Sequence, residues 1–303
     1  MTTAVTDTPV SIKRPLLAWL LLGTLALVWG SSFILMKRSL SVFTSEQVAA
    51  GRIVLAWLFF SPLIANQSRK ADIRSAVRHR WVALLAAGLL GNLIPAFLFA
   101  IAGAHLNSSL SGALNSLSPL FTLLIGVSFF GKQIHSRQLT GILLGLAGSM
   151  LLVFYSATGT FAINGYALLV VLATICYGIN INLIGRYLNH LPSLVSSSWI
   201  FMMVGPLALI ALWPSDVVGR ATQLGAGSSV TALVMLGVFG SGVMTILFNR
   251  LVQLTSPVFA SSVTYLMPMV ALLWGLLDSE RIYFVQYLGM AVCLLGVYLV
   301  NRK

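Results

Sequence analysis

Acidic residues are scarce in this chain of 303 residues, which holds 6 Asp and Glu against 18 Lys and Arg. Charged residues of both signs make up only 8% of the chain, against roughly 25% in soluble domains. This scarcity excludes an ordinary soluble enzyme and a disordered tail. Cysteine is nearly absent too: Cys176 and Cys293 lie in apolar runs, which excludes a disulfide scaffold and gives no metal-ligand spacing. The basic residues interrupt apolar runs instead of forming a patch, so the net charge of +12 predicts no nucleic-acid partner.

Apolar residues, by contrast, make up 58% of the chain and fall into ten long stretches. A membrane-spanning helix needs about 20 such residues, so the chain is predicted to be an all-α integral membrane protein. The first stretch follows Lys13 and Arg14 as a signal peptide would, but it has no convincing cleavage site and is expected to be a mature helix. The predicted spans are residues 16–36, 47–65, 81–102, 108–130, 139–155, 163–185, 194–213, 230–250, 256–277 and 284–301.

The basic residues are distributed unevenly between the two sides that ten spans would define. Thirteen lie in segments on the side of the N-terminus, and four lie on the other side: Lys37, Arg38, Arg220 and Arg281. Because Lys and Arg accumulate in cytoplasmic loops, we predict a multi-pass protein of the cell (inner) membrane with both termini in the cytoplasm.

Glycine, proline and aromatic residues recur at offsets of 148 or 149 residues, which indicates an internal duplication. We expect two five-helix repeats, residues 16–155 and 163–301. Because five is odd, the second repeat would enter the membrane from the opposite side, and such inverted repeats typically open alternately to either face of a transporter. Matched pairs include Trp29-Gly30 with Tyr177-Gly178, Gly88 with Gly237, Gly91 with Gly240, Pro119 with Pro268, Gly141 with Gly289 and Gly148 with Gly296.

Several short motifs occur in a characteristic order. They are Trp29-Gly30-Ser31-Ser32-Phe33, Arg52, Leu117-Ser118-Pro119-Leu120, the Gly141/Gly148 pair, Met267-Pro268 and Ser279-Glu280-Arg281. With them, the chain from about residue 17 to 301 resembles the EamA-type branch of the drug/metabolite transporter superfamily. Gly131-Lys132 departs from the Gly-Glu usual in that family. The resemblance implies ten helices and is strongest to amino acid and metabolite exporters, including the YddG-type exporters of aromatic amino acids. The substrate itself rests on that analogy alone.

Two prolines mark the first candidate binding residues. Pro119 and Pro268 each free the carbonyl four residues earlier, at Asn115 and Thr264. Such a carbonyl at membrane depth is expected to line a cavity, although a simple packing kink is the alternative. Ser118 shares a helix face with Asn115 and joins the candidate site.

Polar and aromatic residues inside the spans complete the candidate site. Asn92 and Phe99 share one face of the third span, as do Ser241, Thr245 and Phe248 in the eighth; bonds between helices are the alternative use. Aromatic side chains could stack on a substrate, and of two asparagines in the sixth span at most one can face inward. These further candidates are Trp29, Tyr177 and Tyr265, and Asn180 with Asn182.

Arg52 is the only full charge inside a predicted span. It could meet a substrate carboxylate, but we expect it rather to reach the outer interface or to bind helix-end carbonyls. The small residues Gly141, Gly145 and Gly148 and their mates Gly289, Cys293 and Gly296 are expected to let helices pack closely. All four histidines (His79, His105, His135 and His190) fall in predicted loops, so no metal site and no cofactor is expected.

No acidic residue lies in the middle of a predicted span, so a buried carboxylate proton relay is not expected. The sequence therefore predicts a carrier, most readily an exporter of aromatic or neutral amino acids and related metabolites, that works by facilitated diffusion or exchange. The alternatives are a carrier of drugs, lipophilic cations or other metabolites, a channel, and a membrane-embedded enzyme. The expected partners are a small-molecule substrate and the lipid bilayer, and a monomer is plausible.

Overall fold

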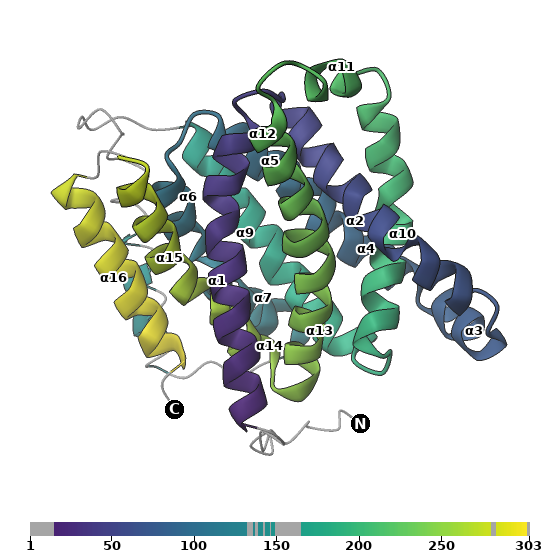
Figure 1. Cartoon of the computed structure of the whole chain (residues 1–303). Coiled ribbons are helices and arrows are strands. Elements are labelled where there is room, and N and C mark those ends of the chain that lie inside the picture. The colour runs from purple at the N-terminus through teal and green to yellow at the C-terminus, as the bar shows by residue number, and fades with distance from the viewer. Residues whose placement is uncertain are drawn as a thin grey trace, which may run out of the picture.

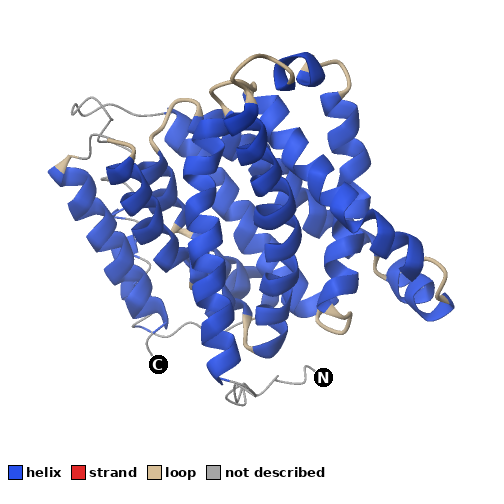
Figure 2. Cartoon of the chain, in the orientation of Figure 1, coloured by secondary structure: helices blue, strands red, loops and turns tan. Residues whose placement is uncertain are grey.

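The computed structural model describes residues 15–131, 165–279 and 283–301, and between the first two ranges residues 136, 139–141, 143–145 and 147–148. Within these residues every regular element is a helix (Figures 1 and 2). Three of them, η1 to η3, are short π-helical turns; η1 and η3 lie inside longer helices, and η2 follows α9 at the end of its span. The first half holds α1 (Pro15–Ser39), α2 (Ser45–Gln67), α3 (Ala71–His79), α4 (Trp81–Gly88), η1 (Leu89–Leu93), α5 (Ile94–Gly103), α6 (Ser108–Asn115) and α7 (Ser118–Phe130). The second half holds α9 (Gly165–Leu183), η2 (Ile184–Leu188), α10 (Ser193–Leu212), α11 (Val217–Ala221), α12 (Gly227–Met235), η3 (Leu236–Val243), α13 (Met244–Leu254), α14 (Pro257–Ser261), α15 (Val263–Leu277) and α16 (Phe284–Asn301).

The all-helical membrane architecture predicted from the sequence is confirmed. Among the described residues, eight helical segments are long and apolar enough to cross a membrane. They correspond to eight of the predicted spans, and α16 has the bounds predicted for the tenth. Most of the predicted span 139–155 lies outside the described residues. Two short helices, α3 and α11, occupy segments that were predicted to be loops, and His79 consequently ends a helix instead of lying in a loop.

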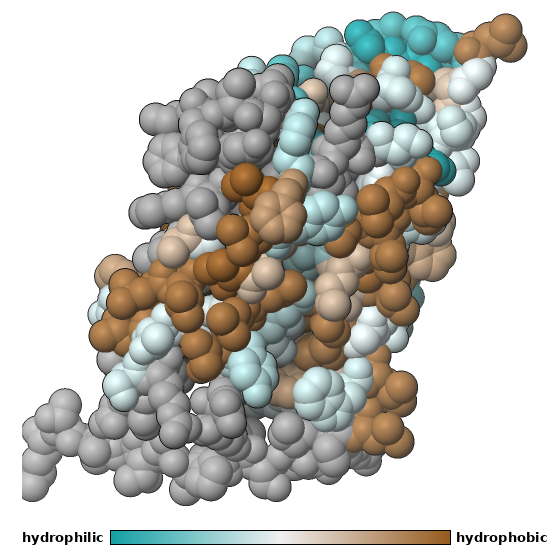
Figure 3. Space-filling view, turned by 90° about the vertical axis from the view of Figure 1, so that its left-hand side faces the viewer, coloured by the Kyte–Doolittle hydropathy of each residue, from teal (hydrophilic) through white to brown (hydrophobic). Residues whose placement is uncertain are grey.

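Large apolar side chains cover much of the described outer surface of the bundle, as a lipid environment requires. Figure 3 shows apolar side chains over the flank that it faces. Large side chains such as Leu273 and Leu277 are 61% and 77% exposed. Water-soluble proteins rarely expose so many large apolar side chains together, so this surface fits helices that face lipid.

Repeat-equivalent caps begin two of the broken spans. The Asn107 side chain accepts a hydrogen bond from the Leu110 backbone N–H at the start of α6. Ser256, which lies 149 residues later, accepts in the same way from the Phe259 N–H at the start of α14. An N-cap side chain satisfies an otherwise unpaired backbone donor, so the equivalent helix in each repeat begins with the same kind of N-cap hydrogen bond.

Two repeat-equivalent glycines determine how the central helices pair. A Cβ atom built on Gly30 of α1 would lie 2.6 Å from the Val270 Cβ of α15. A Cβ built on Gly178 of α9 would lie 2.9 Å from the Thr122 backbone nitrogen of α7. Only hydrogen fits at either position, so α1 packs directly on α15 and α9 packs directly on α7.

The predicted close packing of small residues is confirmed where the structure describes it. A Cβ built on Gly296 of α16 would meet the Gly145 nitrogen at 2.4 Å and the Gly141 carbonyl at 2.6 Å. The helices therefore touch backbone to backbone at this point.

The helix directions are consistent with inverted repeats. In Figure 1 the chain begins α1 and ends α16 at the same end of the bundle, and α1 runs in the opposite direction to its repeat mate α9. Because the two repeats run in opposite directions, their equivalent helices can surround one central cavity.

Candidate functional site

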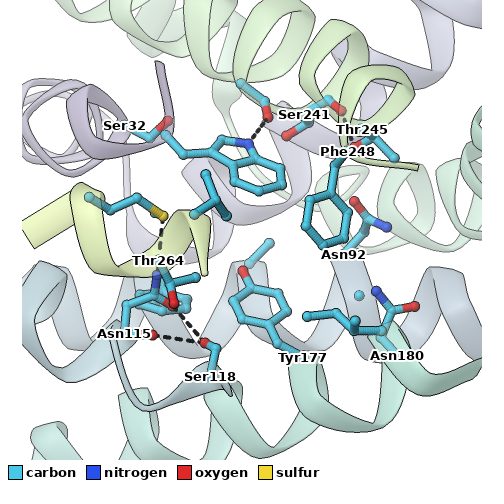
Figure 4. Close-up of a pocket in the computed structure, with 18 of the residues that line it drawn as sticks. Ser32, Asn92, Asn115, Ser118, Tyr177, Asn180, Ser241, Thr245, Phe248 and Thr264 are labelled. Atoms are coloured by element: carbon cyan, nitrogen blue, oxygen red, sulfur yellow. Dashed lines mark hydrogen bonds between the residues drawn. The ribbon is translucent and has the colours of Figure 1, made fainter. Parts of the chain in front are cut away.

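A cavity near the middle of the bundle is lined by residues of both repeats. It holds about 1060 Å³ of empty space, its open mouth included. Nine of the ten predicted binding residues line it (Figure 4). They are Trp29, Asn92, Phe99, Asn115, Ser118, Tyr177, Asn180, Thr245 and Thr264.

Two π-helical turns carry polar residues to the wall of the cavity. Gly91 and Asn92 lie in η1, and Gly240 and Ser241 lie in η3 at repeat-equivalent positions. A π-helical turn adds one residue to a helical turn and is frequent at functional sites. The extra residue rotates the rest of the span, so the sequence pattern of one continuous α-helix does not describe these spans.

Trp29 connects the two repeats across the cavity. Its indole Nε1 donates a hydrogen bond of 2.8 Å to the Gly240 carbonyl in η3. Its ring lies 5.2 Å from that of Phe248. The neighbouring Gly30 faces α15, so this aromatic-glycine pair directs one side chain into the cavity and opens space for a helix on the adjacent side.

The span that contains Pro119 is broken, not merely kinked. α6 ends at Asn115 and α7 begins at Ser118, which places Pro119 in the first turn of the second helix. The predicted free carbonyl of Asn115 is already satisfied, because the Ser118 hydroxyl donates to it at 2.8 Å. The Asn115 side chain donates instead to the Met267 sulfur at 3.5 Å, again from one repeat to the other (Figure 4).

In the second repeat the helix interruption precedes its proline. α14 ends at Ser261 and α15 begins at Val263, whereas Pro268 lies inside α15. Thr264 lines the cavity and donates to the Ser261 carbonyl at 2.9 Å. Tyr265 is not among the residues that line the cavity, and its part in substrate binding stays a prediction.

The two asparagines of the sixth span face different sides, as predicted. Asn180 lines the cavity. Asn182 instead donates to the carbonyls of Thr122 and Gly178 at 2.8 and 2.9 Å, which ties α9 to α7. Figure 4 shows the Tyr177 side chain between Asn180 and the pair formed by Asn115 and Ser118.

Arg52 lines the cavity, so the expectation that it reaches the interface or helix-end carbonyls is wrong. Its Nε donates a hydrogen bond of 3.0 Å to the Ser241 hydroxyl in η3. The side chain thereby crosses from the first repeat to the second. No Asp, Glu or His is among the described residues that line the cavity, so Arg52 is the one formal charge among them.

Aromatic rings form a continuous apolar wall in the cavity. Phe99 stacks on Tyr177 with ring centroids 5.9 Å apart and planes 23° apart, and Phe33 lies edge-on to Phe99 at 6.0 Å. Such clusters present both faces and edges to a ligand. The cavity therefore has an aromatic wall beside hydroxyl, amide and guanidinium groups.

Other lining residues were missed by reasoning from the sequence. Asn249 and Ile200 line the cavity, although neither lies beside a proline or a matched glycine. The Asn249 amide donates to the Ser197 hydroxyl at 2.9 Å, and its buried Oδ1 has no hydrogen-bond partner among the described residues. The matched pair Gly91 and Gly240 was the sequence signal for the π-helical turns, but it was interpreted only as evidence of duplication.

Among the described residues no group of three or more His, Cys, Asp and Glu could hold a metal ion.

A polytopic helical membrane protein with a polar and aromatic cavity between two inverted repeats belongs to the class of small-molecule carriers. The EamA-like transporter family matches residues 16–154 and again residues 164–302, and the chain belongs to this family. Its relatives include a WAT1-related chloroplastic protein of Arabidopsis thaliana, 26% identical over 94% of this chain and 69% of that protein. Another is the uncharacterized inner membrane transporter YedA of Escherichia coli (strain K12), 25% identical over 92% of this chain and 89% of that protein.

The fold also matches a solved structure. A crystal structure superposes with a TM-score of 0.66 at 16% identity, over 94% of this chain and 96% of that chain. This likeness shows a shared fold. The chain is thus a multi-pass membrane transporter of small metabolites.

Proposed function

We propose that this protein exports aromatic or neutral amino acids and related metabolites from the cytoplasm across the inner membrane by alternating access. The observation that carries the proposal is the composition of the cavity, in which stacked Phe99 and Tyr177 lie beside Asn115, Asn180 and Arg52. An aromatic wall suits an apolar side chain, and amides with a guanidinium suit the polar end of an amino acid. Both repeats supply these groups, so rocking of the repeats would expose the same residues to either side.

Transport would follow the substrate gradient by facilitated diffusion or exchange. Proton-coupled carriers commonly hold an Asp, Glu or His within the bilayer, and none lines the cavity among the described residues. Lipophilic cations as substrates are disfavoured because the formal charge in the described lining is positive. A membrane-embedded enzyme needs a base beside a nucleophile, and the described lining offers no His or carboxylate for that role.

The test is reconstitution in proteoliposomes with the standard amino acids as a substrate panel. We expect saturable flux and counterflow for Phe, Tyr, Trp or other neutral amino acids, with no accumulation driven by a pH gradient alone. Liposomes without protein give the background rate. Absence of counterflow for every member of the panel would contradict the proposed substrates, and accumulation driven by a pH gradient alone would contradict facilitated diffusion.

A further inference from the structure

Arg52 lies in a location where a charge needs a partner. It is about 10 Å along the axis from Ser45, at the start of α2, given a rise of about 1.5 Å per residue. Its Nε is bound to a neutral hydroxyl, that of Ser241. A guanidinium inside a membrane protein without an acidic partner is costly. The described lining residues include no Asp or Glu that could offset the free-energy cost of burying this charge.

The fold itself does not require a charge at this position. α2 begins at Ser45 and α10 at Ser193, 148 residues later, which is the offset that also relates Trp29 to Tyr177. The repeat mate of Arg52 is therefore Ile200, and Ile200 also lines the cavity. An isoleucine fills the equivalent site in the same architecture, so the arginine is explained by what the cavity holds and not by helix packing.

The geometry of Arg52 leaves one edge of its guanidinium available. The bond to Ser241 uses Nε, whereas Nη1 and Nη2 donate to no described residue. Two parallel N–H groups on that edge match the two oxygens of a carboxylate, a pairing that is both strong and directional.

We propose that Arg52 is the carboxylate-recognition residue of this cavity: its Nη1 and Nη2 bind a substrate carboxylate end-on, Ser241 holds the guanidinium in place, and amines that lack a carboxylate are excluded. The inference rests on the proposed function, because it names the substrate chemistry of the same cavity. The aromatic wall formed by Phe99 and Tyr177 receives the remainder of the substrate. The carboxylate is the required group, and an ammonium group is tolerated but has no carboxylate partner in the described lining.

Three ligands with one phenyl body test the proposal: 3-phenylpropionate, phenylalanine and phenethylamine. Binding to the purified protein is measured by thermal shift and by isothermal titration. We expect the first two to bind and phenethylamine to bind at least about tenfold more weakly, the loss of a charged pair. Equal binding of phenethylamine, or binding of none of the three, would overturn the inference without any variant being made.

Four variants locate the effect. Arg52→Ile copies the repeat mate and should abolish the preference for carboxylates. Arg52→Lys should keep the preference but bind more weakly, because an ammonium cannot form the two-point pair. Ser241→Ala should weaken carboxylate binding while leaving the preference intact. Ile200→Leu is the matched control, since it reshapes the wall without changing charge and should affect all three ligands alike. Full discrimination in a folded Arg52→Ile variant would contradict the proposal.

Failure of this inference and failure of the proposed function give different results. If carboxylates bind through Arg52 but no amino acid shows counterflow, the amino acid carrier is wrong and the carboxylate site stands. If amino acids show counterflow and Arg52→Ile leaves ligand preference unchanged, the carrier stands and the carboxylate site is wrong.

Discussion

Neighbouring residues in this protein perform different tasks because a helix points them in different directions. Trp29 and Tyr177 reach into the cavity, whereas the adjacent Gly30 and Gly178 allow α15 and α7 to approach. The same division separates Asn180, at the cavity, from Asn182, which bonds to α7. A side chain's role is thus decided by its angle around the helix axis, which composition alone does not reveal.

Gly178→Ala should destabilise the protein. The added Cβ would lie 2.8 and 2.9 Å from backbone atoms of Phe121 and Thr122, which cannot rotate away. We expect a loss of about 1–3 kcal/mol, as for other overpacked interiors, measured as a lower melting temperature in detergent. Gly23→Ala in α1 is the matched control, because nothing lies within 4 Å of that position. Equal melting temperatures for the two variants would show that α9 and α7 do not pack as described.

Asn115→Ala should reduce transport by roughly tenfold, because it removes the cavity-facing amide and its bond to Met267. Initial rates of counterflow in proteoliposomes measure the effect. Asn66→Ala is the control, since Asn66 is an exposed residue near the end of α2. If both variants transport equally, Asn115 takes no part in the site.

At the scale of elements, the spans are interrupted where they meet the cavity. The third and eighth spans contain π-helical turns. The fourth span is broken after Asn115, and the ninth is broken after Ser261. Interruptions of this kind are tolerated within a membrane where they line a cavity or are buried in protein. They occur in both repeats, so each repeat contributes the same kind of wall.

The turn η1 and the helix α9 should be coupled through one contact. A Cβ on Gly91 would overlap the Asn180 side chain, with 2.6 Å to its Cγ. Gly91→Ala is therefore expected to lower the melting temperature and to displace Asn180 from the cavity. Adding Asn180→Ala should restore much of the lost stability but not transport, so the two changes are non-additive in a double-mutant cycle. Additive changes in stability would contradict this contact.

At the scale of the whole molecule, hydrogen bonds join the two repeats at the Lys37 end of α1. Ser229 of α12 bonds to the Ser41 hydroxyl at 2.9 Å and donates to the Arg38 carbonyl at 2.9 Å. Lys37 also pairs with Asp278 at 2.5 Å. An exposed ion pair contributes only about 0–1 kcal/mol, so this end is held by contacts that a rocking motion can break.

A disulfide across this end should block transport. In the double variant Ser41→Cys, Ser229→Cys the two sulfurs replace hydroxyls that lie 2.9 Å apart, so an oxidant is expected to join them. We expect oxidation to stop counterflow and a reducing agent to restore it, because alternating access requires the repeats to separate here. Each single variant under the same oxidant controls for the native cysteines. Unchanged counterflow with the disulfide formed would show that this end does not open during transport.

The membrane class, the placement of most spans and the duplication could be predicted from the amino-acid sequence. These features depend on composition, segment length and offset, which require no knowledge of packing. The sequence also identified nine residues that the structure brings to one cavity, because amides, hydroxyls and prolines are rare and costly in apolar helices. That these residues bind substrate stays a prediction.

Which side of each helix faces the cavity could not be predicted, because it depends on how the helices pack in the folded protein. In the folded protein Arg52 lines the cavity, Tyr265 is not part of the lining, and the turns η1 and η3 interrupt their spans. In a soluble helix the polar face marks the outside, but lipid and protein interior are both apolar, so periodicity does not separate them. The rotation of each helix is then set by contacts such as those of Gly30 and Gly178, which form only when the chain is folded.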